Sequence, residues 1–104
     1  MTFEQRVIEQ IKSIPRGHVT SYGFIAALAG SPRAALQVGR ILHNRGGDLP
    51  WWRVVNKDGI ISIVNIQAPP ELQADLLKQE GIIVTRKGSV FQIDLRRFGW
   101  QPEK

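Results

Sequence analysis

Gly30, Ser31 and Pro32 separate two short segments whose apolar residues recur at helical spacing. Glycine readily takes the left-handed conformation that ends a helix, and serine followed by proline is typical of the start of the next one. The sequence therefore predicts one helix over residues 20–29 and another, capped by Ser31, that runs to residue 42. Two helices joined by so short a connection are a helix-turn-helix candidate.

The segments on either side of this pair complete a small mixed domain. Hydrophobic periodicity, proline positions and turn residues predict, in order, a helix over residues 3–14, a strand over 60–64, a helix from Pro69 towards Glu80, and hairpin strands over 82–84 and 90–95. The expected fold class is therefore α+β and mainly helical, a winged-helix-like helix-turn-helix domain with a small β hairpin.

The length and charge of the chain limit what it can be. Its 104 residues, 42% of them hydrophobic, suit one modest core, so residues 1–104 are expected to form a single domain. Lys and Arg number 14 against 9 Asp and Glu, and the resulting charge of +5 suits a polyanionic partner, although many basic domains bind none. We expect a monomer.

Several classes of site and location are disfavoured by what the chain lacks. Without cysteine there is no disulfide, no thiolate zinc site and no cysteine nucleophile. His18 and His43 lack metal-ligand spacing, so we expect neither a metal nor a cofactor. Charged residues within the first helix rule out a signal peptide or membrane span there, and a cytoplasmic location is the default expectation.

The stretch Pro50-Trp51-Trp52-Arg53-Val54-Val55 carries the most specific functional signal. It resembles the Pro-Cys-His-Arg-Val-Val active-site motif of O6-alkylguanine-DNA alkyltransferases, with Trp51 and Trp52 at the Cys and His positions. An indole cannot act as a thiolate does, because nucleophilic catalysis needs a group that can be deprotonated or activated. The pattern is similar to the alkyltransferase-like proteins, which bind the lesion without repairing it, and it implies a protein that is not an enzyme.

The helix pair extends the resemblance. Residues 20–23, 29–35 and 38–39 resemble the DNA-binding segment of the alkyltransferases, in the same order and at the same distance from the tryptophan motif. The resemblance implies the alkyltransferase C-terminal type of fold, which docks in the minor groove and flips a base out of the stack. The DNA-binding residues it implies are Ser21, Tyr22, Arg33, Ala34, Ala35, Leu36, Gln37, Gly39 and Arg40.

Leu36 departs from the family pattern, which places an arginine finger at this position. Leucine is a known kind of minor-groove wedge, so Leu36 is expected to fill the space left by the flipped base without hydrogen-bonding to the orphaned partner. Arg33 and Arg40, expected on the same helix face, are candidates for phosphate contacts. The alternative is that Leu36 belongs to the core and both arginines are merely solvated.

The resemblance also implies a lesion pocket formed by Tyr22, Trp51, Val54 and Asn44. Tyr22 matches a tyrosine that crowds the phosphate of the target nucleotide, and Asn44 an asparagine that ties the recognition helix to the active-site turn. Trp51 is expected to be a pocket wall. Packing on the core is the alternative for both Tyr22 and Trp51, because aromatic side chains bury much area.

Three further positions have expected roles. Arg53 is expected to be structural. Glu80 matches the acid of the family's catalytic relay, yet without a histidine partner it is more consistent with a salt bridge or a helix end. The loop near Asn65-Ile66-Gln67 corresponds to the lid over the family's pocket, but its residues match poorly.

Our leading hypothesis is a non-enzymatic DNA-damage sensor that binds O6-alkylguanine in duplex DNA, flips the base and promotes nucleotide excision repair. Its competitor is a general helix-turn-helix DNA-binding or regulatory protein that flips no base. An enzyme with another nucleophile is disfavoured because no activated Ser/His/Asp constellation is present. The range of alkyl groups, the repair partner and the affinity for undamaged DNA do not follow from the sequence.

Overall fold

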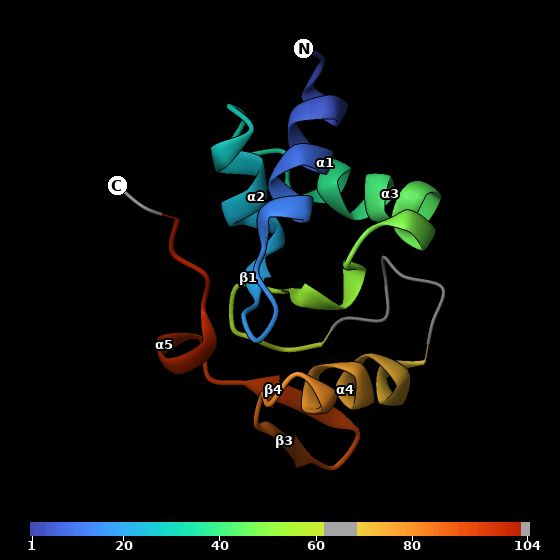
Figure 1. Ribbon diagram of the computed structural model, residues 1–104, viewed down its shortest axis with the longest axis vertical. Helices are drawn as coiled ribbons and strands as arrows, with labels where there is room; N and C mark the ends of the chain where they lie inside the picture. Colours follow the sequence, from blue (N-terminus) through green and yellow to red (C-terminus); the bar gives the residue numbers. More distant parts are fainter. Residues whose placement is uncertain (62–68, 103–104) are drawn as a thin grey trace.

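Three helices form one half of the molecule. The computed structural model describes residues 1–61 and 69–102, and within them α1 (Phe3–Ser13), α2 (Tyr22–Leu28) and α3 (Ala35–Arg45) lie together in the upper half of Figure 1. Thr2 and Gln5 form a reciprocal capping box at the start of α1. The three helices enclose a cluster of buried residues: Val7, Ile11, Ile14, Tyr22, Ile25, Ala26, Ala29, Val38, Ile41, Leu42, Leu49 and Val54.

A second core lies at the opposite end. Here α4 (Pro70–Gln79) packs against the antiparallel hairpin of β3 (Val84–Lys87) and β4 (Val90–Ile93) (Figure 1). The buried residues of this half are Val19, Val55, Ile61, Ala74, Leu77, Ile82, Phe91 and Ile93.

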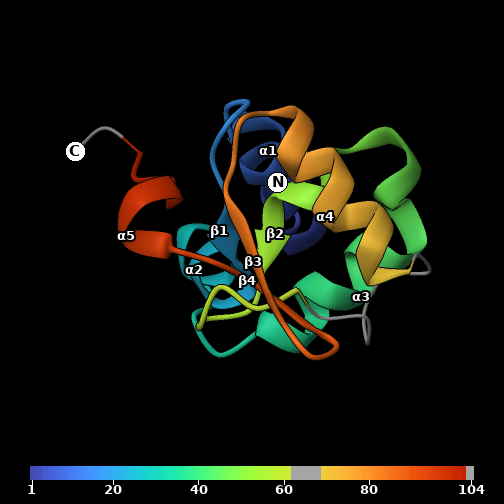
Figure 2. The ribbon, with the colours of Figure 1, turned by 90° about the horizontal axis from the view of Figure 1, so that it is seen from below.

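A short parallel ladder connects the two halves. Strand β1 (Thr20–Ser21) pairs with β2 (Val54–Val55), with Thr20 opposite Val54, and both strands lie in the middle of the molecule in Figure 2. Successive side chains of a strand point to opposite faces. Val54 accordingly belongs to the first core and Val55 to the second, so the ladder anchors the segment before β2 to both.

That segment consists of two single 3₁₀ turns. Helix α3 leads into η1 (Gly46–Asp48), and η2 (Trp51–Arg53) immediately precedes β2. The tryptophan motif is therefore a tight turn held between a helix that ends at Arg45 and a strand buried on both faces. Its backbone geometry is fixed by elements on each side.

The mainly helical α+β class and the helix-turn-helix pair are confirmed, but the start of α3 was predicted too early. Pro32 is not the first residue of that helix. The Ala34 amide donates to the Ser31 carbonyl at 2.9 Å, which closes a turn with Pro32 at its second position, a site that proline also favours. Helix α3 begins only at Ala35 and continues to Arg45, past the expected end at residue 42.

The C-terminal third also differs from the prediction. The hairpin strands are shifted, because Thr85, Arg86 and Lys87 pair with β4 instead of forming the turn. The short helix α5 (Leu95–Phe98), capped by Asp94, was not predicted. Of the expected strand over 60–64, Ile60 forms a single bridge to Gln92 and the Ile61 amide donates to the Phe91 carbonyl of β4 at 3.0 Å. Residues 62–64 and the expected lid at 65–67 lie outside the described residues.

Candidate nucleic-acid interface

The two tryptophans of the motif stack edge to face on the η2 turn. Their ring centroids are 5.8 Å apart and their planes meet at 87°, the T-shaped arrangement that aromatic quadrupoles favour. Both side chains are half-buried. Trp51 packs against the first core and Trp52 against the second, so part of the Trp51 ring has the core contact foreseen as the alternative, and its expected role as a pocket wall stays a prediction.

Glu80 receives hydrogen bonds from three directions at this turn. Its carboxylate accepts from Trp52 Nε1 at 2.7 Å, from Arg53 Nη2 at 2.8 Å and from the Gly17 amide at 2.8 Å. The Glu80 side chain is 3% exposed. Burial alone would raise the pKa of Glu80, but the hydrogen bonds from Arg53, Gly17 and Trp52 together hold it below its ordinary value. Glu80, which matches the acid of the family's relay, thus has the structural role expected for it. We call Glu80 and its three partners Gly17, Trp52 and Arg53 the Glu80 hub.

Arg53 extends this hub to the N-terminal half. Its Nη1 donates to the Ile14 carbonyl at 2.9 Å, just after α1, while Nε and Nη2 contact Glu80. Its guanidinium also lies 5.5 Å from the centre of the Trp52 ring. The expected structural role of Arg53 is confirmed by this geometry.

Gln73 supports the turn from the other side and was missed by sequence reasoning. Its buried Nε2 donates to the carbonyls of Trp52 and Val54, both at 3.0 Å. The signal was present in the sequence, because residues 73, 74 and 77 share one face of α4 and only the first is polar. A glutamine on an apolar helix face indicates a buried hydrogen-bond partner.

On the helix-turn-helix surface, Leu36 lies in the open. It is 57% exposed in the first turn of α3, so the alternative that Leu36 belongs to the core is wrong. Gln37 and Arg40 are exposed on the same helix. Arg33 is exposed too, but it lies in the turn before α3, so its expected place on a shared helix face is corrected. Leu36, Gln37 and Arg40 on α3 and Arg33 in the turn before it are thus all accessible to a partner.

The other residues expected to contact DNA are more enclosed. Ala34 and Ala35 are half-buried, and Gly39 is buried, so Gly39 serves the packing of α3 and does not offer a contact surface. Ser21 is the N-cap of α2, where its hydroxyl accepts from the Phe24 amide at 3.1 Å. Tyr22 is 6% exposed and packs in the first core, the alternative foreseen for it.

Two of the expected pocket residues are not arranged as predicted. Val54 is fully buried under the ladder and lines no open surface, because strand pairing and the Gln73 contact enclose it. Asn44 is exposed in the last turn of α3, and within residues 1–61 and 69–102 no hydrogen bond joins its side chain to the η2 turn. The helix extends past its predicted end at residue 42, which places Asn44 on a helix surface.

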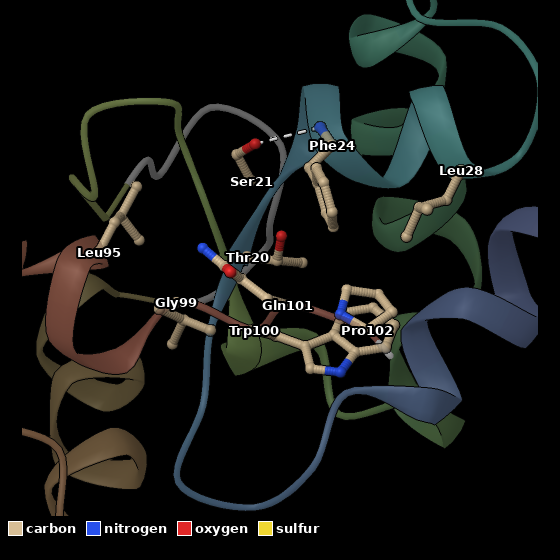
Figure 3. Close-up of a pocket in the computed structure, with 10 residues that line it drawn as sticks. Thr20, Ser21, Phe24, Leu28, Leu95, Gly99, Trp100, Gln101 and Pro102 are labelled. Atoms are coloured by element: carbon tan, nitrogen blue, oxygen red, sulfur yellow. Dashed lines mark hydrogen bonds between the residues drawn. The ribbon is translucent and has the colours of Figure 1, made fainter. Parts of the chain in front are cut away.

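Two cavities border these elements. A shallow one of about 450 Å³ reaches the motif turn and is lined by Lys12, Gly47, Asp48, Leu49, Pro50, Trp52 and Arg53. A larger one of about 600 Å³, shown in Figure 3, lies between α2 and the C-terminal segment, where Phe24 and Trp100 meet edge to face at 6.5 Å. Sequence reasoning did not single out Trp100.

Neither a metal-binding cluster nor a membrane-spanning helix occurs among the described residues. No group of three or more His, Asp or Glu side chains that could hold a metal ion occurs among them. None of the helices in that part of the chain has the length and apolar character needed to cross a membrane.

Comparison with known proteins defines the family. The sequence model of the family described as "6-O-methylguanine DNA methyltransferase, DNA binding domain" matches residues 2–82, and the chain belongs to this family. Within it, the chain is similar to a DNA base-flipping protein of Escherichia coli (strain K12), with 48% identity over 101 residues that cover 95% of this chain and 74% of the relative. The recognition made from the tryptophan motif is confirmed.

A second relative is characterised structurally. Alkyltransferase-like protein 1 of Schizosaccharomyces pombe is 33% identical over 103 residues, which cover 96% of this chain and 95% of that protein. The crystal structure of S. pombe Atl1 in complex with damaged DNA containing O6-carboxymethylguanine matches this fold with a TM-score of 0.87, over 96% of this chain and 95% of that one. The chain is thus an alkyltransferase-like member of the family, similar to a DNA base-flipping relative, and, having no cysteine, it has no thiol to accept an alkyl group.

Proposed function

We propose that this chain binds O6-alkylguanine in duplex DNA from the minor groove, turns the base out of the stack, and holds it beside Trp51 without removing the alkyl group. The observation that carries the proposal is the motif turn itself. Its backbone is held by Gln73 and β2 and its Trp52 and Arg53 side chains by Glu80, as an active-site turn must be, while an indole occupies the position of the nucleophile. A firmly held turn without a thiol suits binding and not turnover.

Trp51 is the proposed contact for the flipped base. Stacking of a base on an aromatic side chain is worth about 1–3 kcal/mol in single-stranded sites. Turning a base out of a duplex costs a few kcal/mol, and damage that weakens pairing lowers that cost. The two magnitudes are similar, so stacking on Trp51 is sufficient to offset the lowered extrusion cost of a damaged guanine, and the higher extrusion cost of an undamaged guanine provides the selectivity.

Leu36 is the proposed wedge. Its exposed side chain would enter the stack where the base has left, as apolar wedges do in minor-groove proteins. Arg33 and Arg40 flank it and are proposed to contact phosphates, which fixes the register of the helix on the duplex. Ser21, Gln37 and the half-buried Ala34 and Ala35 would form the rest of the interface.

Because the lesion stays on the DNA, another activity must remove it. We propose handover to nucleotide excision repair proteins, with the bound monomer as the signal. The cytoplasmic location expected from the sequence stays a prediction. S. pombe Atl1, with its O6-carboxymethylguanine complex, supports a bulky or charged alkyl group as ligand for this chain as well.

The test is a pair of Kd values for duplexes that differ only in one O6-methylguanine, measured at one stated salt concentration because phosphate contacts make affinity salt-dependent. Tighter binding of the damaged duplex is expected. Equal Kd values would refute lesion recognition and leave the general helix-turn-helix reading. Methyl-labelled DNA should transfer no label to the protein, and stoichiometric labelling would contradict binding without transfer.

A further inference from the structure

We propose that Trp52 and Glu80 form a positioning pair that sets the orientation of Trp51 and thereby the selectivity for a damaged base. This inference rests on the proposed function and assigns a role to two residues that the loss of alkyl transfer leaves unexplained. Neither residue needs to touch the base. Trp52 acts through its ring contact with Trp51, and Glu80 acts through its hydrogen bond to Trp52.

The first step is that Glu80 itself is immobile. It is held by the Gly17 amide from the loop after α1 and by two nitrogens of Arg53, whose guanidinium is in turn bound to the Ile14 carbonyl. These partners lie 63 and 27 residues away in the chain from Glu80, so they belong to separate elements. A carboxylate that is 3% exposed and held from several directions is a fixed acceptor.

The second step is that this acceptor fixes the indole of Trp52. The Nε1–H group donates to Glu80 Oε2 at 2.7 Å, and the Arg53 guanidinium lies 5.5 Å from the ring centre. The hydrogen bond fixes the position of the Nε1 edge of the Trp52 ring, and the guanidinium packs against the face of the ring. A tryptophan constrained in both ways has little rotational freedom left.

The third step is the contact with Trp51. The fixed Trp52 ring meets the Trp51 ring at 5.8 Å and 87°, which limits the directions that the Trp51 plane can take. A wall whose orientation is set before binding loses less conformational freedom when a base stacks on it. An undamaged base that stays in the stack does not contact Trp51. The orientation of Trp51 therefore affects the binding of the extruded lesion.

The chemistry explains why tryptophan, and not any bulky residue, stands next to Trp51. Relative to the family's Pro-Cys-His-Arg motif, the ring N–H donor is kept and proton transfer is lost, because an indole N–H does not titrate in this range. Glu80 therefore still accepts a hydrogen bond from the side chain at position 52. The pair preserves the geometry of a relay without its chemistry.

Trp52→Phe tests the pair, since it keeps an aromatic ring and removes the N–H donor. We expect the ratio of affinities for damaged over undamaged duplex to fall roughly three- to tenfold, with the Kd for undamaged DNA unchanged, as loss of one hydrogen bond of ordinary net strength predicts. Trp100→Phe is the matched control: it removes an indole in an edge-to-face pair with Phe24, far from the motif in sequence, and should leave the ratio unchanged.

Trp52→His separates positioning from bulk. Histidine restores an N–H donor on a smaller ring, so this variant should recover at least half of the lost selectivity. An unchanged ratio in Trp52→Phe, or a histidine variant no better than the phenylalanine variant, would overturn the pair. If Trp52→Phe does not fold, Trp52→His alone decides. An affinity ratio for damaged over undamaged duplex in Trp52→His that is more than about fivefold below the wild-type ratio contradicts the inference. A wild-type ratio of one would instead refute the proposed function.

Trp51 can also be observed directly. The chain has 3 tryptophans, so Trp52→His combined with Trp100→Phe leaves Trp51 as the only one, as does Trp52→Phe combined with Trp100→Phe. Fluorescence anisotropy of Trp51 should be lower when position 52 is phenylalanine. Equal anisotropy in the two double variants would show that Trp51 is not oriented by the hydrogen-bonded ring.

Discussion

Replacing Glu80 by alanine removes the acceptor on which three donors converge. Its ion pair with Arg53 is enclosed, since the two side chains are 3% and 15% exposed. Removing one partner of a buried pair leaves the other charge uncompensated and costs about 3–5 kcal/mol. The Gly17 amide and Trp52 Nε1 lose their partner as well. We therefore expect Glu80→Ala to lower the free energy of unfolding by at least 3 kcal/mol.

The chain provides a matched control in Glu4, which pairs with Arg45 at 2.9 Å on the surface. These two side chains are 51% and 54% exposed, and exposed pairs contribute about 0.2–1 kcal/mol. Glu4→Ala should thus cost less than 1 kcal/mol. Both acids pair with an arginine, but Glu80 is enclosed and also accepts from the Gly17 amide and Trp52 Nε1. The difference between the two substitutions therefore measures what enclosure and these two donors contribute together.

Urea denaturation at neutral pH measures both effects. A domain of this length has a stability of roughly 5–15 kcal/mol, so Glu80→Ala should shift the midpoint strongly at a similar slope. A loss below 1 kcal/mol for Glu80→Ala, equal to that for Glu4→Ala, would refute the reasoning. It would mean that water or a rearranged Arg53 satisfies the three donors without the carboxylate.

Three further predictions concern other residues. The pKa of Glu80 is lowered in the folded state, so the ionised carboxylate stabilises the fold above the ordinary glutamate pKa, and this contribution is lost as the pH falls through the lowered value. Acid unfolding of Glu80→Gln, followed by circular dichroism, should therefore depend less on pH than that of the wild type. Leu36→Arg should change stability by no more than about 0.5 kcal/mol, because the side chain is exposed, and should tighten lesion binding in a fluorescence titration. Gly59→Ala should cost about 1–3 kcal/mol in thermal unfolding, since Gly59 has φ +79° and a Cβ there would collide with the Ile93 carbonyl oxygen.

Local signals predicted the boundaries of the first helix well. Thr2 and Pro15 define the first helix because capping and proline chemistry act within a few residues. Pro32 was misplaced for the same reason, since proline suits both the first helical position and the second position of a turn. Sequence alone does not decide between them. The hairpin turn was placed too early because Thr85, Arg86 and Lys87 gain their strand conformation only from β4.

The sequence indicated which residues belong to the candidate site better than it indicated how exposed their side chains are. Trp51 and Leu36 were located from their motif, and Leu36 is exposed as a wedge requires. Val54 was assigned to the pocket although its side chain is enclosed, because that enclosure depends on pairing with Thr20, which is distant in the sequence. The Glu80 hub joins residues from three parts of the chain, and no local pattern shows that these parts meet.

Recognition without transfer is tested most directly by one competition experiment. A labelled duplex with a single O6-methylguanine is bound at fixed salt, displaced by the same duplex with or without the lesion, and then recovered for base analysis. The unlabelled damaged duplex should displace it at a lower concentration than the undamaged one, and the recovered DNA should retain all of its O6-methylguanine. Equal displacement by the two competitors, or loss of the methyl group, would contradict the account.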